Sequence, residues 1–363
     1  MSHLLKYNSS IEFLNLSSSR MNETQMGNIL NGLKENRSVK SIDFSGNNMG
    51  LQEAQLLSEF LKANSTITEI SLSGNSFGTE GLKLITESLT SNNTIHTLYL
   101  SNLQINEEGA QHISNMIKSN TVITKLDLSV NLISTGIKAI SEALVINTTI
   151  TSINLRDCQM REETSLFMSY IIKCNSTITN LIIGGNCFGR DLTQFGESIK
   201  VNPSIKALVL QYNYVDDKQL PFLTEGLKHN TSLTGLYLES NSISDDGAKA
   251  LADCLIINTS LKTIYLSGNN IHPKGIQFIS ESLKLNSSVV YLRLNSNNVN
   301  GEATQALLDA LKQNTTLTQL TYSDTPREGE LDKAIIDLLN ANKEKKCEAI
   351  GEHPLTNWEM KWQ

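Results

Sequence analysis

The sequence has little proline, aromatic character or charge, and it has no long apolar run. Only 5 of its 363 residues are proline, 6% are aromatic and 18% are charged, whereas an average soluble chain has about 25% charged residues. Uncharged polar residues, above all Asn, Ser and Thr, fill the difference. No stretch approaches the roughly 20 apolar residues that cross a bilayer, and the first residues contain no signal-peptide-like apolar segment. We therefore expect a cytoplasmic protein that is not attached to a membrane.

Basic clusters and catalytic motifs are also missing. There are 30 basic and 37 acidic residues, which gives a net charge of −7, whereas binding to nucleic acids or anionic membranes needs a concentrated basic surface. The six histidines have no metal-ligand spacing, and no glycine-rich phosphate loop, serine nucleophile elbow or Cys–His arrangement occurs. We therefore expect no catalytic residues, no metal or other cofactor, and no nucleic-acid partner.

Paired cysteines are absent as well. The five cysteines are an odd number, lie far apart and form no Cys-x-x-Cys pair, at positions 158, 174, 187, 254 and 347. We interpret them as small buried apolar residues of a protein in a reducing compartment.

The sequence does contain a repeat of 27 or 28 residues. Each copy follows the register apolar-x-x-apolar-x-apolar-x-x-Asn-x-apolar, as Ile67, Ile70, Leu72, Asn75 and Phe77 do. The first apolar position recurs twelve times without an insertion, at residues 11, 39, 67, 95, 123, 150, 178, 205, 233, 261, 289 and 317. This half of the repeat predicts a short strand followed by a turn with a buried Asn.

The second half of each repeat predicts a helix. Its apolar residues are spaced by four, as Leu251 and Leu255 are, and an Asn closes every copy. We expect this Asn to adopt the left-handed conformation that ends many helices. Acidic residues such as Asp217 and Asp245 open the helices, and we expect them to interact with the helix dipole. Stacked repeats would form a parallel sheet with an outer layer of helices, each repeat contacting mainly its neighbours.

The register resembles the leucine-rich repeat family, in its long-repeat, ribonuclease-inhibitor-like class, over residues 1 to about 342. The resemblance implies an α/β fold, a curved right-handed solenoid or horseshoe with parallel strands on the concave face and helices on the convex face. In that family the Asn ties neighbouring turns together through backbone hydrogen bonds. Four repeats replace this residue, by Ser19, Leu103, Cys158 and Thr325. Because Leu103 cannot form the bonds, we expect a locally weaker ladder there.

The period divides the chain into three parts, residues 1–10, 11–342 and 343–363. The first is a half repeat, either a minimal N-terminal cap or a sign that the chain is a fragment of a longer one. The second is the leucine-rich repeat domain of twelve repeats. The third carries both tryptophans, Trp358 and Trp362, and is a C-terminal tail or cap, either a lid on the last repeat or a docking or export signal.

Side chains between the aliphatic positions of each strand should face out of the sheet, because strand residues alternate between faces. These positions are mostly small and polar in the first five repeats, and aromatic or apolar side chains gather later. We predict a protein-binding surface on the concave face and rim of repeats 6–11. Its predicted contact residues are Tyr212, Tyr237, Glu239, Tyr265, Tyr291 and Arg293. Tyrosine with arginine is typical of binding hot spots, although tyrosines that only pack on a wide sheet would look the same.

The sequence thus predicts a monomeric, non-catalytic module that binds another protein. The resemblance implies several settings. One is a bacterial effector that acts on a host protein in the host cytoplasm. The alternatives are a small-GTPase regulator similar to Ran GTPase-activating proteins, or a sensor fragment of a larger receptor. For the GTPase alternative the candidates are the rim residues Arg156, Arg161 and Arg190, because an arginine can stabilise charge on a transferring phosphoryl group.

Overall fold

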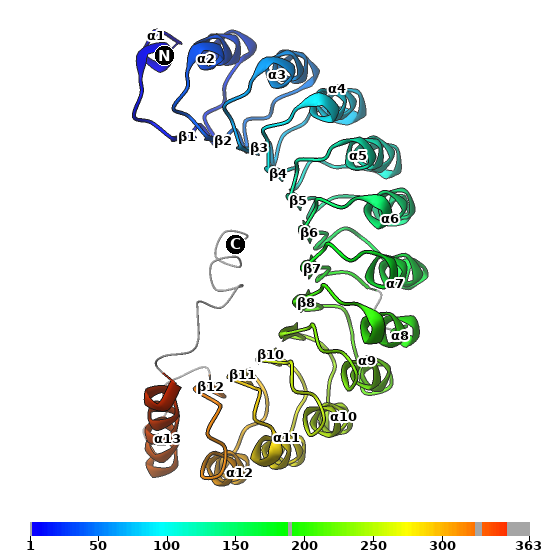
Figure 1. The fold of residues 1–363 in the computed structure, drawn as a ribbon, viewed down its shortest axis with the longest axis vertical. Coiled ribbons are helices and arrows are strands. Elements are labelled where there is room, and N and C mark those ends of the chain that lie inside the picture. Colours follow the sequence, from blue (N-terminus) through cyan, green and yellow to red (C-terminus); the bar gives the residue numbers. More distant parts are fainter. Residues whose placement is uncertain (1, 188–190, 324–328, 347–363) are drawn as a thin grey trace. The chain divides into compact units, whose positions relative to one another are not determined.

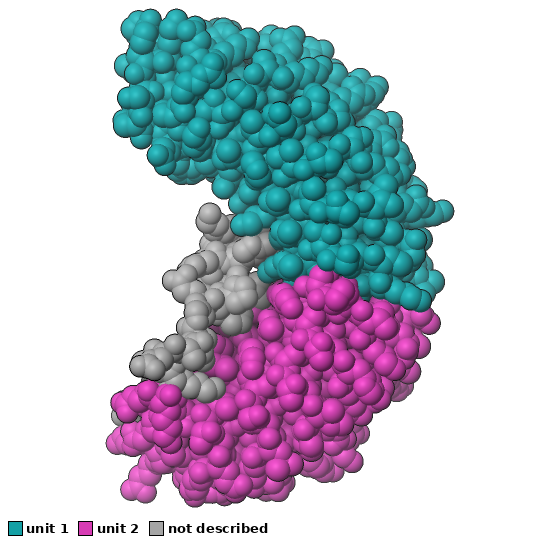
Figure 2. All heavy atoms as spheres, in the orientation of Figure 1, with its two compact units in different colours: residues 1–186 teal, residues 187–363 magenta. Residues whose placement is uncertain are grey.

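The computed structural model describes residues 2–187, 191–323 and 329–346. The chain divides into two compact units, residues 1–186 (unit 1) and residues 187–363 (unit 2), shown in Figure 2. Each unit is a stack of repeats. Along the described ranges, none of the helices combines the length and the apolar character needed to cross a bilayer.

Unit 1 has two layers, one of short strands and one of helices (Figure 1). Its strands are β1 (Phe13–Asn15), β2 (Ser41–Asp43), β3 (Glu69–Ser71), β4 (Thr97–Tyr99), β5 (Lys125–Asp127), β6 (Ser152–Asn154) and β7 (Asn180–Ile182). Its helices are α1 (Ser2–Tyr7), α2 (Glu23–Glu35), α3 (Leu51–Ala63), α4 (Gly78–Ser91), α5 (Glu107–Ser119), α6 (Ile137–Ile146) and α7 (Ser165–Cys174). Short 3₁₀ turns, Ser134–Gly136 and Glu162–Thr164, lead into the last two helices.

Unit 2 has the same two layers (Figure 1). Its strands are β8 (Ala207–Val209), β9 (Gly235–Tyr237), β10 (Thr263–Tyr265), β11 (Tyr291–Arg293) and β12 (Gln319–Thr321). Its helices are α8 (Thr193–Val201), α9 (Leu220–Leu227), α10 (Asp245–Leu255), α11 (Pro273–Leu285), α12 (Gly301–Leu311) and α13 (Glu330–Lys346). The last helix follows the twelfth repeat, and the predicted tail with Trp358 and Trp362 lies outside the described residues.

Consecutive strands within each unit pair in parallel, shifted by one repeat. Ile42 lies opposite Ile70 in unit 1, and Ile264 lies opposite Leu292 in unit 2. The middle residue of a strand points into the core between the layers, as Ile264 does with no exposed surface. The two flanking residues therefore point to the opposite face. The predicted α/β leucine-rich repeat architecture, a strand and a helix in each repeat, is confirmed.

The Asn that follows most of the strands forms the predicted ladder between repeats. The Nδ2 group of Asn131 donates to the carbonyl oxygens of Leu100 and Leu128 at 2.9 and 2.8 Å. Its Oδ1 atom accepts from the backbone N–H groups of Leu103 and Ile105 at 2.9 and 3.1 Å. The side chain of Leu103 can offer no such groups, so the fourth repeat contributes no rung to this ladder. Cys158 partly replaces Asn, because its Sγ atom donates to the Leu128 carbonyl at 3.2 Å.

The Asn that closes each helix forms a second ladder, and its predicted left-handed conformation is wrong. Asn36, for example, is extended, with φ −70° and ψ 140°. Asn230 shows the reason for the residue type: its Nδ2 group donates to the carbonyls of Ile199 and Asn202 at 2.6 and 3.0 Å. Its Oδ1 atom accepts from the N–H groups of Ser232 and Leu233. The buried amide thus serves the backbone of its own repeat and that of the preceding one.

Two aspartates near helix starts also link repeats, rather than only facing a helix dipole. Asp217 Oδ1 accepts from the backbone N–H groups of Ser244 and Gly247 at 2.7 and 2.9 Å, at the start of α10. Asp245 makes the same contact with His272 and Gly275, at 2.8 and 2.9 Å, at the start of α11. Each carboxylate therefore caps the helix of the following repeat, where free N–H groups and the helix dipole both favour an anion.

Candidate functional site

The predicted contact residues come together on what we call the strand face of unit 2, the surface formed by the first and third residues of β8–β12. The parallel register places Tyr237 of β9 opposite Tyr265 of β10, and Tyr265 opposite Arg293 of β11. Tyr291, the first residue of β11, lies opposite Thr263 in the neighbouring row. Three of the predicted residues therefore form one continuous row across three strands.

The other two predicted residues lie just beyond the strand ends. Tyr212 is in the turn after β8, and its backbone N–H donates to the carbonyl of Glu239 at 3.0 Å. Glu239 follows β9 and is half-buried. The main chain thus fixes Tyr212 and Glu239 beside each other at the carboxyl end of the strands, next to the row of Tyr237, Tyr265 and Arg293.

Three side chains of this row stack on one another. The rings of Tyr237 and Tyr265 meet edge to face, with centroids 4.9 Å apart and planes inclined by 78°. The guanidinium carbon of Arg293 lies 4.2 Å from the centroid of the Tyr265 ring. Edge-to-face aromatic pairs and cation–π contacts are both attractive. The stack therefore holds the Arg293 cation in place on the face of the Tyr265 ring.

Exposure divides the predicted residues into two groups. Tyr237 and Tyr265 are 0% and 5% exposed, so they support Arg293 and offer little accessible surface of their own. Tyr212 is 53% exposed, Arg293 is exposed and Tyr291 is half-buried. Glu239 is also half-buried, so these four side chains keep surface that is accessible to solvent.

Tyr214 was not among the contact residues predicted from the sequence. This residue is 56% exposed and, like Tyr212, has a left-handed backbone, with φ 61° against 56°. The same turn positions have positive φ in other repeats, as Val130 and Gln104 do with 57° each, so this conformation belongs to the turn of the repeat. The signal was available in the sequence, because the two positions that flank the turn Asn hold only Ser, Gly or Asn in the next three repeats, as Ser240 and Ser242 show.

The outward face of the unit 1 strands is chemically different. It is largely polar, and the third strand residues include Asp43, Ser71, Tyr99 and Asp127. Burial raises the pKa of Asp127 to about 6. The hydrogen bond that the Ser129 N–H donates to this carboxylate acts in the opposite direction and lowers the pKa. Burial also raises the pKa of Tyr99 to about 12, helped by the nearby carboxylates of Glu69 and Asp127. Among the described residues of unit 1, this face has no stack of aromatic rings and arginine like that of unit 2.

The rim arginines of the GTPase alternative are not gathered into a site by the described structure. The Nε atom of Arg156 lies 3.1 Å from the Asp157 carboxylate, so that part of its charge is already balanced. Arg161 is exposed and its carbonyl accepts the Thr164 N–H at the start of a 3₁₀ turn. Arg190 lies outside the described residues.

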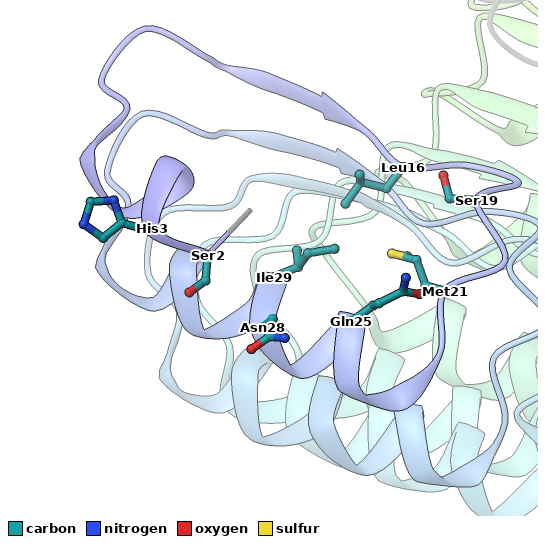
Figure 3. Close-up of a pocket in the computed structure, with 8 residues that line it drawn as sticks. All are labelled: Ser2, His3, Leu16, Ser19, Met21, Gln25, Asn28 and Ile29. Atoms are coloured by element: carbon teal, nitrogen blue, oxygen red, sulfur yellow. The ribbon is translucent and has the colours of Figure 1, made fainter.

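A hollow of about 450 Å³ lies at the start of unit 1, between α1, α2 and the turn after β1 (Figure 3). Its lining includes His3, Met21, Gln25 and Ile29, with small polar residues between them. His3 is the one titratable side chain among the lining residues. The hollow therefore brings together no set of acid, base or nucleophile, and none of the predicted contact residues lines it.

The cysteines are only partly as predicted. Cys158 and Cys254 are buried, whereas Cys174 and Cys187 are exposed. Burial raises the pKa of the Cys254 thiol to about 12 and that of Cys158 still further above its ordinary value. Cys347 lies outside the described residues.

Comparison with known families gives a match over most of the chain. The sequence model described as "MHP1/HER1/GIP3 LRR domain" matches residues 50–342. Curated proteins yield no match to the sequence.

Similar solved structures share the fold. The leucine-rich repeat-containing protein LegL7 from Legionella pneumophila is 22% identical with a TM-score of 0.52, over 78% of this chain and 92% of that chain. A chain of the yeast Rad7 and Elc1 complex is 13% identical with a TM-score of 0.55, over 90% of this chain and 82% of that chain. A chain of the TLR13–ssRNA13 complex is 16% identical with a TM-score of 0.52, over 84% of this chain and 39% of that chain. At these identities the likeness extends to the fold alone.

Proposed function

Because the chain belongs to the MHP1/HER1/GIP3 LRR domain family, we propose that it is a non-catalytic module that binds another protein through the strand face of unit 2. Repeat solenoids present long, regular surfaces that suit protein partners. The observation that carries the proposal is the stack of Tyr237, Tyr265 and Arg293, with exposed Tyr212 at the neighbouring turn. Tyrosine and arginine are enriched among the residues that dominate binding energy.

The residues have different roles in this proposal. Tyr212, Tyr291 and Arg293 contact the partner, because they keep exposed surface. Tyr237 and Tyr265 hold Arg293 from beneath and contribute through its orientation. The bacterial-effector setting stays a prediction, because the likeness to LegL7 is one of fold. The GTPase-regulator setting also stays a prediction, and no arrangement of Arg156 and Arg161 favours it over binding.

Affinity capture from a eukaryotic lysate, read by mass spectrometry, tests the proposal. The chain is compared with the triple variant Tyr212→Ala/Tyr291→Ala/Arg293→Ala. A matched control removes two tyrosines and one arginine that are exposed in unit 1, as Tyr7→Ala/Tyr170→Ala/Arg37→Ala. Circular dichroism melting establishes that all three chains are folded.

We expect a set of proteins that both the unaltered chain and the control retain and that the strand-face variant loses. Retention of the same proteins by the strand-face variant would show that binding uses another surface. Loss by the control variant alone would place the binding site in unit 1.

A further inference from the structure

We propose that Arg293, held on the ring of Tyr265, recognises a carboxylate side chain of the partner, so that the strand face of unit 2 selects an acidic extended segment. This inference rests on the proposed function and specifies the chemistry of the partner. Recognition depends on the Arg293 guanidinium and on the residues around it.

The side chain of Arg293 contacts an aromatic ring. Its guanidinium carbon lies 4.2 Å from the Tyr265 ring centroid, and such a cation–π contact uses none of the N–H donors in a hydrogen bond. A guanidinium has five N–H donors in its plane that match the two oxygens of a carboxylate. Tyr265 is itself 5% exposed and fixed against Tyr237. The cation is therefore preorganised, which lowers the ordering cost of binding.

No acidic residue of the described ranges lies within salt-bridge distance of Arg293. Other cations of unit 2 differ, because Lys228 is bonded to Glu225 at 2.7 Å and Lys284 to Glu281 at 2.6 Å. The neighbours of Arg293 across the strands are Tyr265 and Thr321, which are both uncharged. An anion at Arg293 would thus meet a cation that forms no ion pair with the described residues.

The surroundings favour a carboxylate over a phosphate group. The first and third residues of β8–β12 contain no arginine or lysine besides Arg293. Phosphorylated side chains carry close to two negative charges and are bound by clusters of arginines. A single guanidinium matches the single charge and the two oxygens of Asp or Glu.

The spacing of the strands sets the length of the segment. Tyr212 follows β8 and Arg293 ends β11, three strands further along unit 2. With about 4.8 Å between parallel strands, these residues are separated by roughly 14 Å across the sheet. An extended peptide covers this distance with about four residues. We therefore expect the acidic residue to lie about four positions from an apolar or aromatic residue that contacts Tyr212 and Tyr214.

Selection from a phage-displayed library of short random peptides tests the inference, with the unaltered chain and Arg293→Glu as separate baits. Arg37→Glu is the matched control, because Arg37 is an exposed arginine of unit 1. We expect the unaltered chain and the control to enrich peptides with Asp or Glu at a fixed distance from an apolar residue. Arg293→Glu should lose them, and the best peptide should bind to it at least roughly tenfold more weakly.

The conservative variant Arg293→Lys should keep the acidic preference with reduced affinity, because it retains the charge and loses the planar group. Enriched peptides without acidic residues, or the same peptides with the Arg293→Glu bait, would overturn the inference and leave the proposed function intact. Failure of the folded, unaltered chain to enrich any peptide would contradict recognition of an extended segment at this face, whereas only the affinity-capture experiment decides the proposed function.

Discussion

Tyr237 lies over Gly235, two residues earlier in the same strand. A Cβ atom on Gly235 would come within 2.8 Å of Cε2 and 3.0 Å of the hydroxyl oxygen of the Tyr237 ring. Both residues point to the same face of the sheet, because strand side chains have a period of two. The missing side chain at position 235 thus lets the ring lie down on the sheet, where it meets the edge of Tyr265.

The first prediction follows from this contact. Gly235→Thr should push the Tyr237 ring off the strand and lower stability by about 1–3 kcal/mol, the usual cost of overpacking. Because the tilted ring also supports Tyr265, the variant should bind partners of the strand face more weakly. Urea unfolding and binding of the selected peptide measure the two effects.

The control for this substitution is Ser41→Thr, at the same strand position in β2, where the third residue is Asp43 instead of a tyrosine. It should change stability by much less than Gly235→Thr does. Equal stability and equal peptide binding of Gly235→Thr and the unaltered chain would show that the ring does not depend on the glycine.

The second prediction concerns the Asn ladder of the strand turns. Asn131→Ala removes the amide that serves the carbonyls of Leu100 and Leu128 and the N–H groups of Leu103 and Ile105. Leaving several buried backbone groups without partners should cost about 3 kcal/mol. Denaturant unfolding measures this change. Asn115→Ala, on the exposed side of α5, is the control, and a similar cost for both would contradict the assignment of Asn131 to the ladder.

Much of the fold was predictable because the period fixes which residues must be buried. The positions of Ile264 and Leu292 in the register placed them in the core and, by alternation, placed Tyr265 and Arg293 together on the other face. The row of contact residues could therefore be predicted before any coordinates. The helix-ending Asn was also found from the sequence, but its role was misread, because spacing shows that an amide is needed without showing its partners.

Contacts between repeats account for most of the features that were not predicted from the sequence. The carboxylate of Asp217 caps α10 of the next repeat, and the local sequence around Asp217 suggests only the start of its own helix. The burial of Tyr237 likewise depends on neighbouring strands and on Gly235 beneath it. Among equivalent positions of the repeats, Gly235 and the pair Tyr212 and Tyr214 differ from their counterparts in residue type.

The third prediction tests the cap between repeats. Asp217→Ala removes the acceptor for the N–H groups of Ser244 and Gly247 and should lower stability by about 1–2 kcal/mol. Asp246→Ala is the matched control, because Asp246 is an exposed acidic residue in the first turn of the same helix. Thermal melting compares the two. A loss of stability in Asp246→Ala as large as that in Asp217→Ala would assign the effect to helix charge instead of the cap.

The last prediction concerns the reactivity of the cysteines and its dependence on pH. Burial raises the pKa of Cys254 to about 12 and also raises that of Cys158, so neither forms an appreciable amount of the reactive thiolate near pH 8. A raised thiol pKa favours the neutral form in the folded protein, so raising the pH to 9 should still leave both thiols unmodified. The exposed Cys174 and Cys187 should react with iodoacetamide under the same conditions, at pH 8 to 9. Peptide mapping by mass spectrometry distinguishes the four sites, with alkylation in denaturant as the control for full reactivity. Rapid labelling of Cys254 in the folded chain at pH 8 would show that α10 separates readily from the core. That result would contradict the stable packing of repeats on which the strand face of unit 2 depends.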